Sequence, residues 1–247
     1  MELYCLEECV VQKYTDIINR TQCLRAVKCA DLVYRERCYQ TKWHGVPADA
    51  GICSFLEDFL GENGTAFEDM MEKVRAEAES VLLILDSFKR EVKRIVKQYQ
   101  GYLWHVTSKK GLSYVETSRH QINMYGNASL DAVFATSDEI HRLLYAGRAV
   151  AGGMEVDSRC ICRYETNPFS EESGGIGILK NTVYSYQLDV RYFEPVIDFI
   201  MCGDDKGEIC YGREWVSKEK KVPVMKCCEI KEIDMRKLGK YRIQGYH

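Results

Sequence analysis

The most regular hydrophobic pattern of the chain lies between residues 65 and 100. Apolar side chains recur there in alternating steps of four and three residues, at Phe67, Met71, Val74, Ala78, Val81, Leu85, Phe88, Val92, Ile95 and Tyr99. This is a heptad seam over about five heptads, which is typical of helices packed side by side. Thr65 and Glu68 have the spacing of a capping box at its start. The pattern predicts one long helix whose apolar stripe packs on the helices of 2–42, on the second half of the chain or on another copy.

The rest of the first hundred residues also has a helical pattern. Residues 2–42 carry apolar side chains at mixed helical spacing, and a break with Pro47 and two glycines follows in HGVPADAG. Within the long helix the first half is acidic and the second half basic, which suits the helix dipole. The basic end is compatible with phosphate contact or with an ordinary solvated helix end. We predict a helical module over 1–100 that is coiled-coil-like, with 65–100 as a surface for a regulatory partner or for self-association.

After Gly101 the pattern changes to short segments rich in β-branched and aromatic residues, separated by Gly, Asn, Asp and Pro. The segments are YLWHVT, AVFAT, SRCICRY, NTVYSYQLDV, DFIMC and CCEIKEIDM. Two helices are expected between them, around 110–124 and 138–148, the second with Ser137 as its N-cap. The glycine-rich ESGGIG at 172–177 is expected to be a mobile loop. The fold class is therefore α+β, with the helical module followed by a mixed, mostly antiparallel β domain over 101–247.

Composition narrows the function classes only slightly. The 247 residues are 46% hydrophobic and 29% charged with a net charge of -3, which favours a globular protein without a general attraction to nucleic acid or anionic membranes. No apolar run reaches the roughly 18 residues of a membrane span, and the first residues lack the pattern of a signal peptide. We therefore expect a cytoplasmic protein without a membrane partner.

The chain has twelve cysteines, which leaves disulfides, a metal site or free thiols as interpretations. The spacings Cys5-x3-Cys9 and Cys160-x-Cys162 contain no CxxC pair, and no histidine stands at zinc-finger spacing. The sequence favours reduced, mostly buried thiols over disulfides or a structural metal.

His105 is the first candidate for chemistry. It lies in YLWHVTS on an apolar segment and is followed closely by Thr107 and Ser108. A lone histidine in such a place is most often a core residue with a hydrogen-bond partner. His120 and His141 are expected to be exposed helix residues.

Glu214 is the second candidate. In GREWVS the alternation of a strand sends Arg213, Trp215 and Ser217 to one face and Glu214 and Val216 to the other. A carboxylate facing inward beside apolar neighbours is costly unless it has a partner or a function. The ordinary alternative is a surface carboxylate paired with Arg213. The chain contains no P-loop, no GxGxxG after a strand, no HExxH and no GxSxG.

The order of these residues resembles the ADP-ribosyltransferase superfamily. His105 on the first strand is followed by GL, then by a strand that ends near Phe134, a helix that bears Tyr145, and a late strand that carries Glu214 in EWVS. This order is similar to that of the histidine-tyrosine-glutamate branch, which includes the poly(ADP-ribose) polymerases and the diphtheria-type toxins. The resemblance covers about 101–230 and leaves the helical half unexplained.

The resemblance implies a role for each of these residues. His105, with Thr107 beside it, would hold the ribose of NAD as the co-substrate, and the rings of Phe134 and Tyr145 would clasp the nicotinamide. Glu214 would stabilise the transition state of nicotinamide-ribose cleavage. The implied function is NAD-dependent mono-ADP-ribosyl transfer to a macromolecular acceptor, either protein or nucleic acid.

Three positions depart from the family pattern. Phe134 stands where a tyrosine is usual, Val106 follows the histidine where many relatives have glycine, and Gly212 stands two residues before Glu214, where the arginine-targeting relatives carry a second acid. Those relatives are therefore a poor model for this chain.

Other functions remain open at this stage. The same fold can serve an NAD glycohydrolase or an RNA 2′-phosphotransferase, which relies on several arginines, for which Arg119, Arg148, Arg159 and Arg163 are available. A third interpretation is a non-catalytic interaction protein that works through its helical half.

Overall fold

The computed structural model describes residues 2–39, 67–122, 128–156, 159–197, 199–202 and 207–246. Contacts within the chain divide it into two compact units. The first unit comprises Met1–Ile95, Arg119–Leu130 and Ile197–Gly212, and the second comprises Val96–Ser118, Asp131–Val196 and Arg213–His247. The helical first half of the chain thus shares its unit with two segments from later in the sequence.

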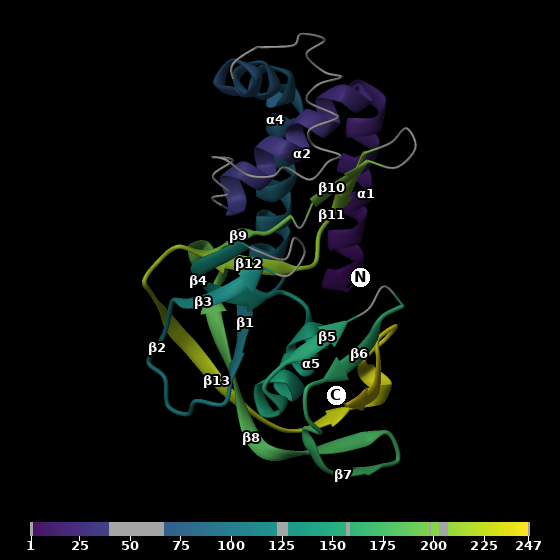
Figure 1. Cartoon of the computed structure of the whole chain (residues 1–247). Coiled ribbons are helices and arrows are strands. Elements are labelled where there is room, and N and C mark those ends of the chain that lie inside the picture. Colours follow the sequence, from purple (N-terminus) through teal and green to yellow (C-terminus); the bar gives the residue numbers. More distant parts are fainter. Residues whose placement is uncertain are drawn as a thin grey trace. The chain divides into compact units, whose positions relative to one another are not determined.

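In its described part, the first unit is built on three helices, α1 (Leu3–Thr21), α2 (Leu24–Tyr39) and α4 (Phe67–Tyr99). Two short strands, β10 (Phe199–Cys202) and β11 (Gly207–Cys210), form a hairpin that packs on α2 and α1 (Figure 1). Backbone N–H groups of this hairpin bond to α1, because Gly207 N donates to Asn19 Oδ1 at 2.9 Å and Ile209 N donates to Thr15 Oγ1 at 3.3 Å.

The apolar stripe of α4 is buried as the heptad pattern requires. Its buried members are Met71, Val74, Ala78, Val81, Leu85, Phe88 and Val92. Ile95 is half-buried and Tyr99 is exposed, so the burial ends before the helix does. Thr65 of the predicted capping box lies outside the described residues.

Part of the surface that covers the stripe comes from α1. The ring of Tyr14 meets Phe88 edge to face at 5.8 Å between centroids, and the Tyr14 hydroxyl donates to Glu91 Oε2 at 2.9 Å. Lys13 Nζ lies 2.7 Å from the same oxygen, and this hydrogen bond, together with that from Tyr14, holds the pKa of Glu91 below its ordinary value. The chain itself therefore supplies a partner for its heptad seam.

The second unit contains a large antiparallel sheet and the helix α5 (Glu139–Ala151). The strands of this sheet that lie in the second unit are β1 (Tyr102–Thr107), β2 (Tyr114–Glu116), β4 (Ala128–Thr136, from Asp131 on), β7 (Phe169–Ser173), β8 (Ile176–Asp189), β9 (Glu194–Pro195), β12 (Glu214–Ser217) and β13 (Lys221–Asp234). Their order is β2-β13-β8-β1-β4-β12-β9, with β7 beside β8. A smaller sheet has the order β14 (Arg242–Tyr246), β6 (Ile161–Tyr164), β5 (Met154–Val156). The predicted α+β class with a mostly antiparallel sheet is confirmed.

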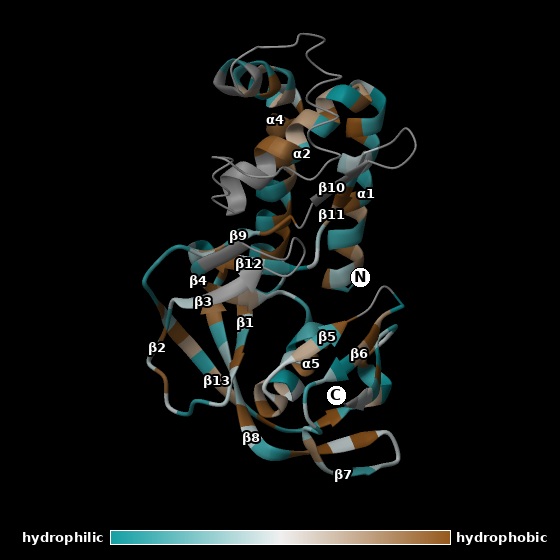
Figure 2. Ribbon diagram, viewed as in Figure 1, coloured by the Kyte–Doolittle hydropathy of each residue, from teal (hydrophilic) through white to brown (hydrophobic). Residues whose placement is uncertain are grey.

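Sequence patterns explain the long strands. Brown and teal residues are mixed along β8 (Figure 2), and hydrophobic Ile178 and Leu179 are followed by hydrophilic Lys180 and Asn181. Gly174 and Gly175, with φ of 59° and 81°, form the two-residue turn between β7 and β8. Two consecutive positive φ angles are typical of a type I′ hairpin, which glycine adopts without strain. The prediction of a mobile loop at 172–177 is therefore wrong.

Two further expectations need correction. The segment around 110–124 forms no helix in its described part but the strands β2 and β3 (Ser118–Ile122), because Val115 pairs with Val222 of β13 and is buried. The helix predicted at 138–148 is confirmed as α5, but its N-cap is Asp138 and not Ser137. The Asp138 carboxylate accepts a hydrogen bond from Ile140 N at 2.8 Å.

The cysteines also differ from the expectation of mostly buried thiols. Cys29 and Cys162 are buried, and burial raises their pKa values to about 12 and about 11. Exposed thiols are Cys5, Cys9, Cys23 and Cys227. Cys5 and Cys9 lie on α1, Cys227 lies on β13 and Cys23 lies between α1 and α2, so the cysteine count alone does not predict burial. Among the helices of the described ranges, none has both the length and the apolar character needed to cross a membrane.

Close packing of α5 on β6 gives a first testable prediction. A Cβ added at Gly147 would collide with the ring of Tyr164, which is fully buried and donates to Leu144 O. We expect Gly147→Ala to lower the free energy of unfolding by about 1–3 kcal/mol, the usual cost of overpacking a core. Urea unfolding measures this cost, with Arg148→Ala on the exposed side of the same helix as the control. Equal stability of the two variants would contradict the packing described here.

Candidate active site

Three neighbouring strands and one helix position the predicted site residues. The strands β1, β4 and β12 are consecutive in the sheet and carry His105, Phe134 and Glu214, while α5 carries Tyr145. All four side chains are half-buried, so each is anchored in the fold and still accessible to solvent. These residues span more than a hundred positions of the chain, and the sheet brings their strands together.

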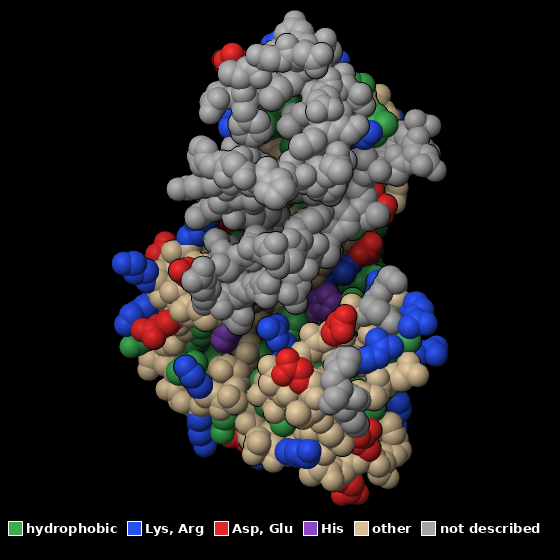
Figure 3. All heavy atoms as spheres, viewed as in Figure 1, with side chains coloured by type: hydrophobic (Ala, Val, Ile, Leu, Met, Phe, Trp, Pro, Cys, Tyr) green, Lys and Arg blue, Asp and Glu red, His purple; other side chains and the backbone are tan. Residues whose placement is uncertain are grey.

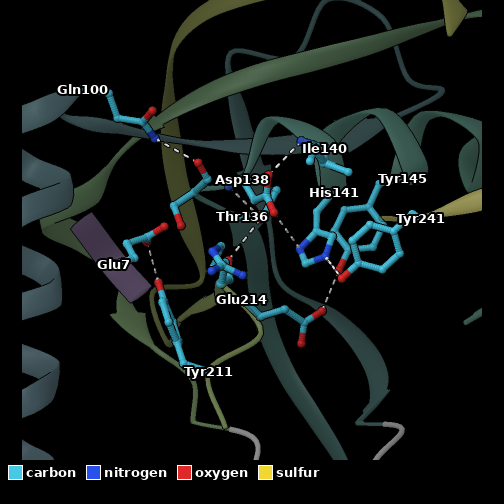
Figure 4. A network of polar contacts seen from close by, with 12 residues as sticks. Glu7, Gln100, Thr136, Asp138, Ile140, His141, Tyr145, Tyr211, Glu214 and Tyr241 are labelled. Carbon is cyan, nitrogen blue, oxygen red and sulfur yellow. Dashed lines mark hydrogen bonds and ion pairs between the residues drawn. The ribbon is translucent and has the colours of Figure 1, made fainter. Parts of the chain in front are cut away.

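Among the side chains of these four residues, those of Tyr145 and Glu214 are joined by a hydrogen bond. The Tyr145 hydroxyl donates to Glu214 Oε1 at 2.8 Å, across from α5 to the first residue of β12 (Figure 4). Val216 lies opposite Phe134, and Glu214 lies opposite Thr136, so the side chains of these four residues share one face of the sheet. An aromatic ring, a phenol and a carboxylate are therefore grouped on the side of the sheet that faces α5.

The buried face of β12 is the opposite one. Trp215 is fully buried, and Ser217 and Arg213 are nearly so, while Glu214 and Val216 are half-buried. The predicted division of the strand into two faces is confirmed, but Glu214 lies on the more open face. Its carboxylate therefore keeps contact with solvent, which lowers the cost of its charge.

The backbone just before Glu214 is held in an unusual conformation. Arg213 has a φ of 59°, in the left-handed region that few residues other than glycine adopt. Its carbonyl oxygen accepts from Thr136 Oγ1 at 3.1 Å and from Ser137 N at 3.3 Å. These two bonds fix the start of β12 against the end of β4 and with it the position of Glu214. Such strain is often found at functional sites.

His105 is placed differently from Glu214. β1 pairs with β8 along Tyr102–Thr107, whereas its pairing with β4 is at Trp104 and Thr136. Trp104 is aligned with Thr136, so its side chain lies on the same face as that of Thr136. The side chains of His105 and Thr107 therefore lie on the opposite face of the strand. The imidazole Nδ1 of His105 lies 2.8 Å from Phe134 O and so bridges β1 and β4. The predicted residues are thus joined by hydrogen bonds as two pairs, His105 with the Phe134 backbone and Tyr145 with Glu214.

His141 is the residue whose surroundings the sequence pattern predicted wrongly. It was expected to be an exposed helix residue, but its side chain is only 13% exposed and lies beside that of Tyr145 (Figure 4). Its Nε2 lies 3.0 Å from the hydroxyl of Tyr241, and its Nδ1 lies 3.8 Å from Asp138 Oδ2. The spacing of four between His141 and Tyr145 on a helix was the available signal, because such residues share one face.

Burial sets the protonation of this histidine. Desolvation lowers the pKa of His141 below its ordinary 6.5, against the opposing effects of Asp138 and Glu214, and Arg213 and Lys240 lower it further. Burial therefore favours the neutral imidazole. Its Nε2 can then accept a hydrogen bond from the Tyr241 hydroxyl, while Nδ1 lies 3.8 Å from Asp138 Oδ2 and has no hydrogen-bond partner among the described residues.

An arginine of α5 also lies on the face of the sheet that this helix covers. Arg142 stacks on Trp104 at 4.0 Å from the ring centroid, and its Nε donates to Ser185 Oγ at 2.9 Å. Its Nη1 also donates to Glu139 Oε1 at 2.6 Å. By contrast, Arg148 and Arg159, which were considered for an RNA 2′-phosphotransferase, are exposed, and Arg163 is on β6 in the smaller sheet. The side chain of Arg119 lies outside the described residues.

The surface of the described residues is mixed in charge. In Figure 3 histidine side-chain atoms reach this surface among basic and acidic side chains. Within the described ranges, no group of three or more His, Cys, Asp or Glu side chains is placed to hold a metal ion.

Comparison with known proteins identified no relative. No protein-family model matches the chain, and neither a curated protein nor a solved structure is significantly similar to it. A functional interpretation of this chain therefore depends on its own residues and on the resemblance in the order of its motifs.

Proposed function

We propose that this chain is an NAD-dependent mono-ADP-ribosyltransferase whose site lies at β1, β4, β12 and α5. The observation that carries the proposal is the hydrogen bond between Tyr145 and Glu214. It joins two residues that the order of motifs along the chain assigns to one site. It also leaves the carboxylate half-exposed, so that a substrate can reach it.

The chemistry required of Glu214 is electrostatic. When the bond between C1′ of the ribose and the pyridinium nitrogen breaks, nicotinamide leaves with the bonding electron pair and positive charge develops on the ribose, as in glycoside hydrolysis. The Glu214 carboxylate stabilises this charge and orients the 2′-hydroxyl or the acceptor. The acceptor then bonds to C1′ and releases its proton to water. The Tyr145 hydroxyl holds the carboxylate at one oxygen throughout.

The remaining residues bind the co-substrate in this proposal. The rings of Phe134 and Tyr145 stack on nicotinamide, which contributes on the order of 1–3 kcal/mol per ring by analogy with base stacking. The resemblance also assigns the ribose to His105 and Thr107, but these lie on the face of β1 opposite Phe134 and Glu214, so the proposal depends on Phe134, Tyr145 and Glu214. His105 Nδ1–H donates to the Phe134 carbonyl, which fixes the orientation of its ring, and the resemblance assigns it an orienting role.

Incubation of the full chain with NAD, followed by measurement of free nicotinamide, tests the proposal. Labelled NAD in the presence of cell lysate then separates transfer from hydrolysis, because a transferase places the label on protein or nucleic acid and a glycohydrolase releases free ADP-ribose. Absence of both NAD binding and nicotinamide release would contradict the proposal and favour an interaction protein that works through its helical half.

Loss of the Tyr145 hydroxyl gives a second prediction for this site. Tyr145→Phe keeps the ring and removes a hydrogen bond to a charged group, which is worth about 1.5–3 kcal/mol. We expect kcat for nicotinamide release to fall by about tenfold to a hundredfold, with KM changed by no more than a few-fold. Tyr114→Phe, at an exposed position of β2, is the matched control. Equal kcat values for the two variants would exclude a role for the Tyr145 hydroxyl.

A further inference from the structure

The proposed NAD site leaves its neighbouring polar cluster without a function. Asp138, at the N-cap of α5, lies 3.8 Å from Nδ1 of His141, and His141 Nε2 lies 3.0 Å from the hydroxyl of Tyr241. The side chains of Asp138 and His141 are 8% and 13% exposed. The imidazole is thus hydrogen-bonded to a phenol 100 residues further along the sequence, while its Nδ1, near the Asp138 carboxylate, has no hydrogen-bond partner among the described residues.

The pair of His141 and Tyr241 is in contact with the Tyr145–Glu214 pair. His141 and Tyr145 are four residues apart on α5, and their rings lie 6.1 Å apart between centroids with an interplanar angle of 35°. On its other side the imidazole meets the ring of Tyr241 at 5.4 Å and 64°. His141 therefore lies between two tyrosine rings, and Figure 4 shows these side chains together beside the Glu214 carboxylate.

Charged groups from three elements face this histidine. Asp138 comes from the start of α5, Arg213 and Glu214 come from the start of β12, and Lys240 comes from the segment before β14. Since burial favours the neutral imidazole, His141 acts as a hydrogen-bonding and packing group and not as a counter-ion of Glu214. A neutral imidazole that is held by the Tyr241 hydroxyl at Nε2 and packed between two tyrosine rings is a support for the ring of Tyr145.

We propose that His141, oriented by its hydrogen bond with Tyr241, is a positioning residue that holds the Tyr145 hydroxyl on Glu214. This inference rests on the proposed function, because it assigns His141 to the same NAD site. His141 touches neither NAD nor the acceptor in this arrangement. It acts through Tyr145, so its effect disappears when the Tyr145 hydroxyl is absent.

Kinetics of nicotinamide release test this dependence in a double-mutant cycle. Tyr241→Phe removes one hydroxyl and is expected to lower kcat about fivefold to tenfold in the wild-type chain but to have no further effect beside Tyr145→Phe. His141→Gln, which retains a hydrogen-bonding group, is expected to keep several-fold more activity than His141→Leu. Additive losses in the cycle, or equal activity of the Gln and Leu variants, would overturn the inference.

A second cycle does not depend on NAD. The unfolding equilibrium constant of the Tyr145→Phe, Tyr241→Phe double variant is expected to differ at least threefold from that calculated from the single variants. The control pair Tyr145→Phe with Tyr114→Phe is expected to be additive within twofold. If the coupling is present and the wild-type chain does not cleave NAD, the proposed function fails while the support of Tyr145 stands. If NAD is cleaved and both cycles are additive, the positioning role of His141 fails alone.

Discussion

Replacement of Glu214 by glutamine is expected to reduce the rate of nicotinamide release from NAD by about a hundredfold to a thousandfold, the usual cost of losing one electrostatic group aimed at a developing charge. Glutamine has nearly the same size, and its amide oxygen can still accept the hydrogen bond from the Tyr145 hydroxyl at Oε1. The side chain should therefore keep its place while its negative charge is lost. The NAD ground state has no ribose cation, so we expect the Kd for NAD to change by only a few-fold.

Two measurements on the same protein separate binding from chemistry. Nicotinamide release gives the rate, and titration with NAD gives the Kd. Glu232→Gln is the matched control, because Glu232 is an exposed carboxylate on β13 and its loss should leave both quantities unchanged. Wild-type rates in Glu214→Gln would remove Glu214 from the reaction, and a large rise in Kd with an unchanged kcat would assign it to binding alone.

Local patterns predicted the parts of the fold that depend on neighbouring residues. The long helix α4 follows from its heptad repeat, the strand of His105 from its β-branched and aromatic residues, and the helix that carries Tyr145 from helical spacing, each within one segment. The order of motifs also predicted a site at Glu214, and its bond to Tyr145 is in keeping with that hypothesis.

The errors occurred where distant segments decide the structure. Val115 pairs with Val222 from a strand about a hundred positions later, and this pairing replaces the expected helix around 110–124. His141 was predicted to be exposed because no local pattern indicates that Tyr241 covers it. The segments Arg119–Leu130 and Ile197–Gly212 join the helical unit, although nothing in their composition resembles it. Sequence patterns of short range contain no information on such contacts.

Truncation of Phe88 is expected to have the largest effect on stability. Phe88 is fully buried in the seam of α4 and meets the rings of Tyr14 and Tyr211 edge to face, at 5.8 and 5.7 Å between centroids. Loss of a buried phenylalanine leaves a cavity and costs about 3–5 kcal/mol. Edge-to-face aromatic contacts add about 0.5–1.5 kcal/mol each beyond the buried area. Phe88→Ala should therefore lower the free energy of unfolding of the helical unit by at least about 3 kcal/mol.

Leu83→Ala is the appropriate control for this experiment, because Leu83 lies on the same helix and is 60% exposed. Substitutions at such positions usually change stability by less than about 0.5 kcal/mol. Urea unfolding followed by circular dichroism at the helical band measures both variants. If a second copy of the chain buried most of the seam, the loss of unfolding free energy in Phe88→Ala would depend on protein concentration. If α1 of the same chain covers the seam, this loss is independent of protein concentration. The contact of Tyr14 with Phe88 favours the second result.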